Sequence, residues 1–164
     1  MRGKWAAGIE PRNFAWIVKD KLAVSERPGG YARNHRKVRR QEEIIWLREQ
    51  GFTRVVSLLS SNHNLHAYDE LGMPWSHVPF GQGEELQDSL TKLYTGLRQW
   101  MADGEKLLVH QEELGDRLMG VVAGYLLWTK VLQSGPQAIA VIEQIVQKQM
   151  GPAGREIVAL APSL

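Results

Sequence analysis

The chain contains no cysteine, and this absence excludes several kinds of chemistry. Without a thiol there can be no disulfide, no thiolate metal site and no cysteine nucleophile. Long hydrophobic runs are also missing, since the longest, Leu118 to Trp128, is too short to cross a bilayer. The N-terminal residues lack the continuous apolar core of a signal peptide. We therefore expect a cytoplasmic protein without a membrane span, whose fold rests on side-chain packing alone.

A strong charge of one sign is missing as well. The formal net charge is +2 at pH 7, which is too small to indicate nucleic-acid binding by the whole chain. Basic residues are nevertheless concentrated in the segment RNHRKVRRQ, at Arg33, Arg36, Lys37, Arg39 and Arg40. The simplest interpretation is the solvated start of a helix. The alternative is a docking patch for an acidic protein, a phosphoinositide or RNA, whose binding would be sensitive to salt.

The length and the order of patterns predict one α/β domain over residues 1–164. The chain has 164 residues, 43% of them hydrophobic, which is enough for a single core. Strand-like runs occur in FAWIVKDKLAVS, as a pair around a Lys-Asp-Lys turn, and then in TRVVSLL, PWSHVPF and KLLVH. Helices are predicted at 38–50, in NHNLHAYDELG, in GQGEELQDSLTKLYTGLRQWMADG up to Gly104, at 117–133 and in GPQAIAVIEQIVQKQM, which ends at Gly151. This alternation favours a sandwich around a mostly parallel sheet of four to five strands flanked by helices, with sites at the carboxyl ends of the strands.

The segment LLVHQEELGDRLMGVVAGYLLW has the pattern of an anion site. A buried strand ends at His110, a polar loop containing Gly115 follows, and Arg117 opens an apolar helix. Unpaired backbone N–H groups and the helix dipole favour an anion at such a point, and an arginine can add a bidentate contact to phosphate. In the alternative interpretation Arg117 pairs with a neighbouring carboxylate and the loop is only a connection.

Some neighbouring residues are expected to have structural roles. Gly120 and Gly124, within the apolar helix, should allow close packing against the sheet. His63 and His66 are three residues apart, but no third ligand stands near them in the sequence. No metal or cofactor is therefore expected.

The segment VHQEELGDRLMG resembles the signature HCxxGxxR of the Cys-dependent dual-specificity and tyrosine phosphatases. The resemblance takes His110, Gly115 and Arg117 as the histidine, glycine and arginine of the signature, with Gln111 in the position of the nucleophile. It extends from about residue 13 to 148, through NFAWIVKDKLAVSERPGG, EEIIWLREQGFTRVVSLL and YDELGMPWSHVPF. It implies a phosphate loop formed by His110, Gln111, Glu112, Glu113, Leu114, Gly115, Asp116 and Arg117, in which a buried His110 orders the loop.

The chemistry implied by the resemblance needs three groups that this sequence lacks. Gln111 replaces the nucleophilic thiolate with a neutral amide. Leu118 replaces the hydroxyl residue that assists departure of the sulfur. The aspartate acid is expected at 81–83, where the sequence reads Gly-Gln-Gly. Glu84 is a weak candidate for the general acid, as is Glu85, although both also suit the start of a helix.

These departures predict a catalytically inactive phosphatase-like protein, a pseudophosphatase that acts as a binding or regulatory module. Its partner would be a protein or a phosphorylated ligand at the former active-site face. Glu112 and Glu113 should weaken phosphate binding, or an internal carboxylate or Gln111 should occupy the loop beside Arg117. One alternative is a dual-specificity phosphatase that uses a Glu-activated water, or one whose natural cysteine has been replaced by Gln111. Another is an anion or nucleic-acid binder that acts through residues 33–40.

Overall fold

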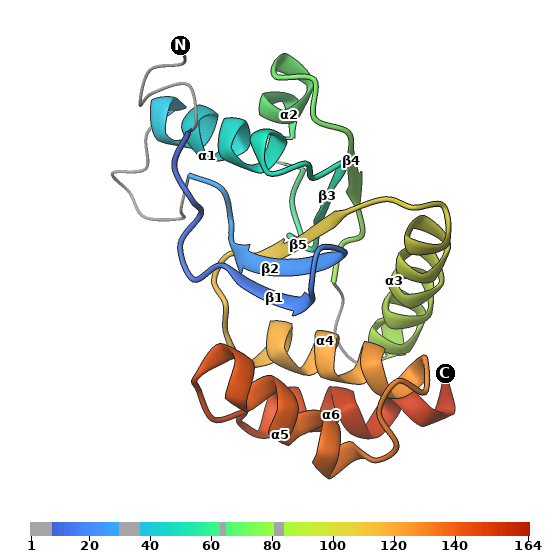
Figure 1. The fold of residues 1–164 in the computed structure, drawn as a ribbon. Helices are drawn as coiled ribbons and strands as arrows, with labels where there is room; N and C mark the ends of the chain where they lie inside the picture. The colour runs from blue at the N-terminus through green and yellow to red at the C-terminus, as the bar shows by residue number, and fades with distance from the viewer. Residues whose placement is uncertain (1–7, 30–36, 63–64, 81–83) are drawn as a thin grey trace.

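Five strands form one sheet, and helices cover both of its faces (Figure 1). The computed structural model describes residues 8–29, 37–62, 65–80 and 84–164. The elements are β1 Ala15–Val18, β2 Leu22–Glu26, α1 Lys37–Glu49, β3 Arg54–Ser57, α2 His66–Glu70, β4 Trp75–His77, α3 Glu84–Ala102, β5 Leu107–Gln111, α4 Asp116–Trp128, α5 Gly135–Val146, α6 Pro152–Leu160 and the 3-10 helix η2 Ala161–Ser163. Among the described helices, none is long and apolar enough to cross a membrane.

The strand order is β1-β2-β5-β3-β4. β1 runs antiparallel to β2, to which it is joined by a turn with Asp20 at a positive φ of 64°, and the other neighbouring strands pair in parallel. The prediction of a single-domain, mostly parallel α/β sandwich is thus confirmed.

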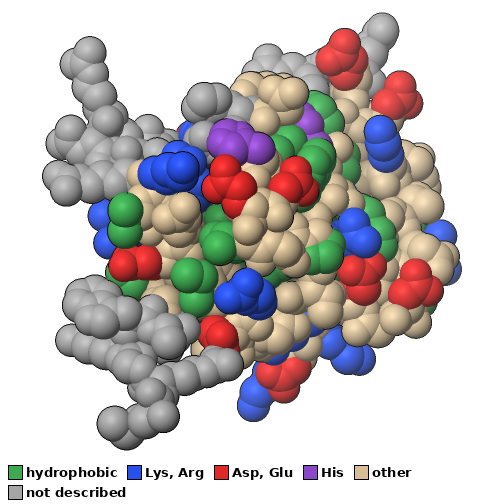
Figure 2. All heavy atoms as spheres, turned by 90° about the horizontal axis from the view of Figure 1, so that it is seen from above, with side chains coloured by type: hydrophobic (Ala, Val, Ile, Leu, Met, Phe, Trp, Pro, Cys, Tyr) green, Lys and Arg blue, Asp and Glu red, His purple; other side chains and the backbone are tan. Residues whose placement is uncertain are grey.

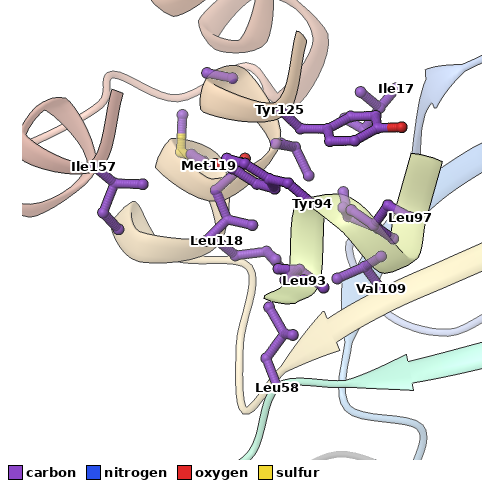
Figure 3. Packing of buried hydrophobic residues seen from close by; sticks show 14 of the residues in the cluster. Ile17, Leu58, Leu93, Tyr94, Leu97, Val109, Leu118, Met119, Tyr125 and Ile157 are labelled. Carbon is purple, nitrogen blue, oxygen red and sulfur yellow. The ribbon is translucent and has the colours of Figure 1, made fainter. Parts of the chain in front are cut away.

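Side chains alternate between two cores on opposite faces of the sheet. In β5, Leu107 and Val109 face the larger core, whereas Leu108 faces the smaller one, which α1 and α2 cover. α3 and α4 cover the other face, and α5 and α6 pack beyond α4 (Figure 1). Figure 3 shows side chains of α3, α4 and the strands meeting in the larger core, where Leu118 lies near Leu93.

The register brings four strand ends to one edge of the sheet. Glu26 of β2 is the partner of Gln111, and Ser57 of β3 is the partner of both His110 and His77. The loops that follow β2, β3, β4 and β5 therefore leave the sheet together. This is the edge where the sequence predicted a site.

The C-terminal third differs from the prediction in three places. α5 ends at Val146 rather than next to Gly151, because Gln147 takes a positive φ of 62°. α4 ends at Trp128 rather than Gln133, because Thr129 bonds back to the Tyr125 carbonyl and Lys130 takes a positive φ of 64°. α6 was not predicted at all. Its nine residues include Gly154, and the Gly151–Pro152 pair that begins it was interpreted only as the end of α5.

The sequence suggested that the glycines of α4 allow close packing against the sheet. In the structure they face other helices instead. A Cβ at Gly120 would lie 2.5 Å from the Gly154 carbonyl oxygen of α6. A Cβ at Gly124 would lie 2.5 Å from the Tyr94 hydroxyl of α3, which donates to the Val121 carbonyl. The small residues of α4 therefore admit the backbone of α6 and the hydroxyl of a neighbouring helix.

Candidate functional site

A cavity of about 480 Å³ opens at the edge where the strands end. Its walls come from the segments after β3, β4 and β5 and from the first turn of α4. The described residues that line it are Leu58, Leu59, Ser60, Phe80, Gln111, Glu112, Glu113, Gly115, Asp116 and Arg117. The predicted loop and Arg117 are thus brought to one cavity, together with Phe80 and residues 58–60, which the sequence interpretation missed. Their place at the carboxyl ends of two predicted strands was the available signal.

The loop between β5 and α4, residues 112–115, is short and held from both sides. Gly115 is the N-cap of α4, with extended backbone angles of −108° and −167°. Leu114 points inward, with 2% of its surface exposed, and its carbonyl accepts a 2.8 Å hydrogen bond from Lys148 Nζ. Counted from His110, the signature HCxxGxxR has its glycine at position 114, where this chain has Leu114. Gly115 therefore lies one residue after the position of the signature glycine, whereas His110 and Arg117 lie at the expected positions.

His110 lies behind the loop, fully buried. Its Nδ1 is 3.1 Å from the Gln111 carbonyl, which can only accept, so Nδ1 carries the proton. Nε2 then accepts from the Tyr68 hydroxyl at 3.3 Å. Burial lowers the pKa of His110 to about 4, and the positive charges of Arg27 and His77 act in the same direction, against the hydrogen bond to Gln111. The ring is neutral at pH 7 and ties β5 to α2.

Arg117 lies on the side of the cavity that Phe80 forms. Its guanidinium carbon is 4.7 Å from the centroid of the Phe80 ring, which is a cation–π distance. Phe80 follows β4 and is itself buried. The aromatic ring thus places the arginine charge beside the N-terminus of α4.

The acidic residues of the loop differ in their surroundings. Glu112 pairs with Arg27 at 3.3 Å and is 53% exposed. Asp116 accepts a 3.0 Å hydrogen bond from the Gly154 N–H at the start of α6, and its other carboxylate oxygen is buried without a hydrogen-bond partner among the described residues. Glu113 is exposed and forms no hydrogen bond or ion pair with any described residue. Within the described part of the chain, Glu113 is therefore a carboxylate of the cavity without a compensating contact.

The resemblance implies a general acid at residues 81–83. Residues 81–83 lie outside the described residues. Glu84 is the first residue of α3, and only its backbone is described, whereas Glu85 is exposed on the same turn. Glu84 therefore remains a candidate from the sequence alone.

The basic segment is partly used inside the fold. Arg33 and Arg36 lie outside the described residues, and Lys37 is exposed at the start of α1. Arg39 bonds to the buried Glu43 carboxylate at 2.7 Å. Arg40 is half-buried, and its pKa is lowered by burial and then by the charge of Arg27.

Arg39 is thus partly engaged by the fold and Arg40 is partly buried, while the docking patch over residues 33–40 stays a prediction. In the view from above (Figure 2), blue and red side chains of the described residues are interspersed over this face.

Solved structures identify the fold, although no family model and no curated protein sequence matches the chain. Kinase-associated phosphatase, with its catalytic cysteine substituted by serine, aligns with a TM-score of 0.79 and 18% identity over 93% of this chain and 95% of its own. The chain has the fold of the dual-specificity phosphatases. PTPMT1 aligns with a TM-score of 0.71 and 14% identity, covering 92% of this chain and 94% of its own. Human DUSP28 aligns with a TM-score of 0.67 and 18% identity, covering 94% of this chain and 96% of its own.

Proposed function

We propose that this phosphatase-fold protein is a catalytically inactive binding or regulatory module. The observation that carries the proposal is Gln111, which ends β5 and lines the cavity where the resemblance expects the nucleophile. A glutamine amide is neutral and does not ionise in water, so it cannot form the covalent phosphoenzyme intermediate. The cavity itself is retained. Its partner would be a protein or a phosphorylated ligand that contacts this face.

Two further features support inactivity. Leu118, at the position of the assisting hydroxyl, is fully buried in the larger core and offers no hydrogen bond. Glu112 and Glu113 add negative charge to the lining. At a separation of about 7 Å, each carboxylate would repel a phosphate dianion by roughly 1 kcal/mol in water and about 5 kcal/mol at an effective dielectric constant of about 20. Phosphate binding should therefore be weak.

The second candidate is a dual-specificity phosphatase whose natural cysteine has been replaced at position 111. The fold is equally consistent with this candidate, and one of the similar solved structures is a phosphatase whose catalytic cysteine was substituted by serine. The two candidates predict different side chains at the position of Leu118. A chain that lost its cysteine alone would keep the assisting hydroxyl, whereas this one has Leu118 in the core.

The test is a search for turnover. The purified chain should release no phosphate from an aryl phosphate or from phosphoserine and phosphotyrosine peptides above the rate in buffer, because Gln111 cannot form the covalent intermediate. Arg117→Ala is the matched control, since a contaminating phosphatase would be unaffected by it. Turnover that disappears in Arg117→Ala, and in Glu84→Gln or Glu85→Gln, would overturn the proposal and indicate a water activated by glutamate.

A further inference from the structure

We propose that Lys148 is a positioning residue for the β5–α4 loop, and that it turns the Gly115 N–H toward the cavity as a donor for an oxyanion. The inference rests on the proposed function, because it concerns how the retained cavity would hold a phosphorylated ligand. Lys148 acts on the peptide bond that follows Leu114, the residue at the position of the signature glycine.

The β5–α4 loop separates the main cavity from a smaller one of about 140 Å³. Glu113 and Gly115 line the main cavity, whereas Leu114, which stands between them, lines the smaller cavity together with Lys148. The Leu114 side chain is buried, and its carbonyl accepts the 2.8 Å hydrogen bond from Lys148 Nζ. The carbonyl is therefore directed to the side of the smaller cavity, away from the main one.

The direction of this carbonyl fixes the direction of the next N–H. The described chain contains no cis peptide bond, and in a planar trans peptide the C=O and the following N–H point in opposite directions. The Gly115 N–H therefore points away from Lys148 and toward the main cavity, which Gly115 lines. No group of the described residues accepts a hydrogen bond from this N–H, so it is available to a ligand.

Gly115 makes the opposite orientation of the peptide accessible. Its φ is −108°, and turning the Leu114–Gly115 peptide over would change this angle by about 180°, into the left-handed region that glycine adopts readily. The reversed peptide would point the Leu114 carbonyl into the main cavity, where its partial negative charge would repel an oxyanion. The hydrogen bond from Lys148 is made only in the present orientation, and it therefore selects the state that offers a donor.

Lys148 is presented by a turn that is itself held at both ends. Gln147, the C-cap of α5, takes a positive φ of 62°, and its N–H donates to the Glu143 carbonyl. Met150 is buried, and its N–H donates to the Glu143 carboxylate at 2.6 Å. The backbone on either side of Lys148 is thus fixed to α5. Its side chain can therefore act on the loop from a defined position.

The test is an NMR titration of the 164-residue chain with inorganic sulfate, followed at the Gly115 backbone amide. Sulfate should shift this amide in the unchanged protein, with a weak Kd because Glu112 and Glu113 repel the anion. Lys148→Met should raise the Kd by about fivefold, the scale of one exposed charge-assisted hydrogen bond, since only molecules with the present orientation bind. Lys148→Arg keeps the charge and a donor, and its Kd should stay within about twofold.

Gly115→Ala separates positioning from simple attraction of the anion by the lysine charge. A Cβ at Gly115 would meet only the Glu113 side chain, at 3.5 Å, so alanine fits the present orientation. It disfavours the reversed one, because an L side chain is strained at positive φ. In the Gly115→Ala background, Lys148→Met should therefore change the Kd by less than about twofold, although the charge is still removed.

Three outcomes overturn the proposal. They are an unchanged Kd in Lys148→Met, an equal loss of affinity in both backgrounds, and the absence of a sulfate-dependent shift of the Gly115 amide in the unchanged protein. Any of them without turnover refutes the role of Lys148 alone. Turnover that depends on Arg117 refutes the proposed function instead.

Discussion

Gln111 and Leu118 restrict the chemistry of the loop to different degrees. Gln111 is half-buried, lines the cavity and can be exchanged with little repacking. Leu118 is fully buried among residues of α3 and the strands (Figure 3). A hydroxyl residue in its place would lose packing and would need a hydrogen-bond partner in an apolar core. Replacing Gln111 therefore affects only the loop, whereas replacing Leu118 also disturbs the larger core.

Gln111→Cys should restore a reactive thiol without restoring efficient catalysis. The new thiol would lie beside Arg117 and the N-terminus of α4, surroundings that lower a thiol pKa below its free value of about 8.5. Alkylation by iodoacetamide at pH 7 should exceed that of Ser60→Cys, an exposed site on the same cavity, by about tenfold or more. Mass spectrometry measures both rates.

Turnover by Gln111→Cys should remain slow, with an initial burst of product. Each missing assisting group commonly costs about 100-fold or more. The rate of an efficient phosphatase would mean that Gln111 is the only block. A thiol no faster than that of Ser60→Cys would mean that the site does not behave as a phosphate cradle, although the fold is shared.

At the scale of elements, the C-terminal helices hold the loop in place. Lys148 lies beyond α5 and bonds to the Leu114 carbonyl. Asp116, in the first turn of α4, accepts from the Gly154 N–H in the first turn of α6. The carboxylate thus serves as a cap supplied by one helix to another. The cavity wall depends on α6, which is distant in sequence from β5.

Gly154→Ala should destabilise the protein by separating α4 from α6. Its Cβ would lie 2.5 Å from the Asp116 carbonyl oxygen and 2.6 Å from Met150 Cγ, and the backbone atom cannot easily move away. We expect the free energy of unfolding to fall by about 1–3 kcal/mol, net of the gain in helix propensity. Urea denaturation measures the change.

Gly96→Ala in α3 is the matched control for this substitution. Its Cβ would meet only the Trp100 ring, at 3.1 Å, and a side chain can give way. We expect a change within about 1 kcal/mol of zero, because helix propensity offsets the crowding. If the two substitutions had equal effects, the contact between α4 and α6 would not limit stability.

At the scale of the whole molecule, acid should weaken the fold through His110. Burial lowers the pKa of His110 to about 4 in the folded state, against about 6.5 in an unfolded chain. The unfolded state therefore binds the proton first as the pH falls. The contribution of the neutral ring is complete above pH 6.5 and is lost progressively down to pH 4, by about 3 kcal/mol.

Urea titrations between pH 7.5 and 4.5 test this expectation. His110→Asn should be less stable at neutral pH but should lack the additional loss below pH 6.5. His66→Asn, at an exposed position on α2, should retain it. All three proteins keep Glu43, whose pKa is raised by burial. Its contribution to stability increases as the pH falls, opposite to that of His110, and it cancels when the three proteins are compared. An identical pH dependence in all three proteins would exclude His110 as the cause.

The sequence by itself determined the sheet and the position of the cavity. The continuous apolar run of β5 specifies a strand buried on both faces, and the strand-helix alternation specifies parallel pairing. Parallel strands end at one edge, so the loop after Gln111 had to lie there. The absence of cysteine excluded a thiol mechanism before any geometry was known.

Only the tertiary structure decided which charges face the cavity and what holds its wall. Arg27 and Glu112 are 85 residues apart, and Gly154 and Asp116 are 38 apart, so no local pattern pairs them. α6 is short and contains a glycine, and its stability comes from packing against α4 rather than from its own propensity. Contacts between distant segments depend on the folded backbone. Whether Glu112 or Glu113 has a partner among the described residues is therefore decided only when those residues have been placed.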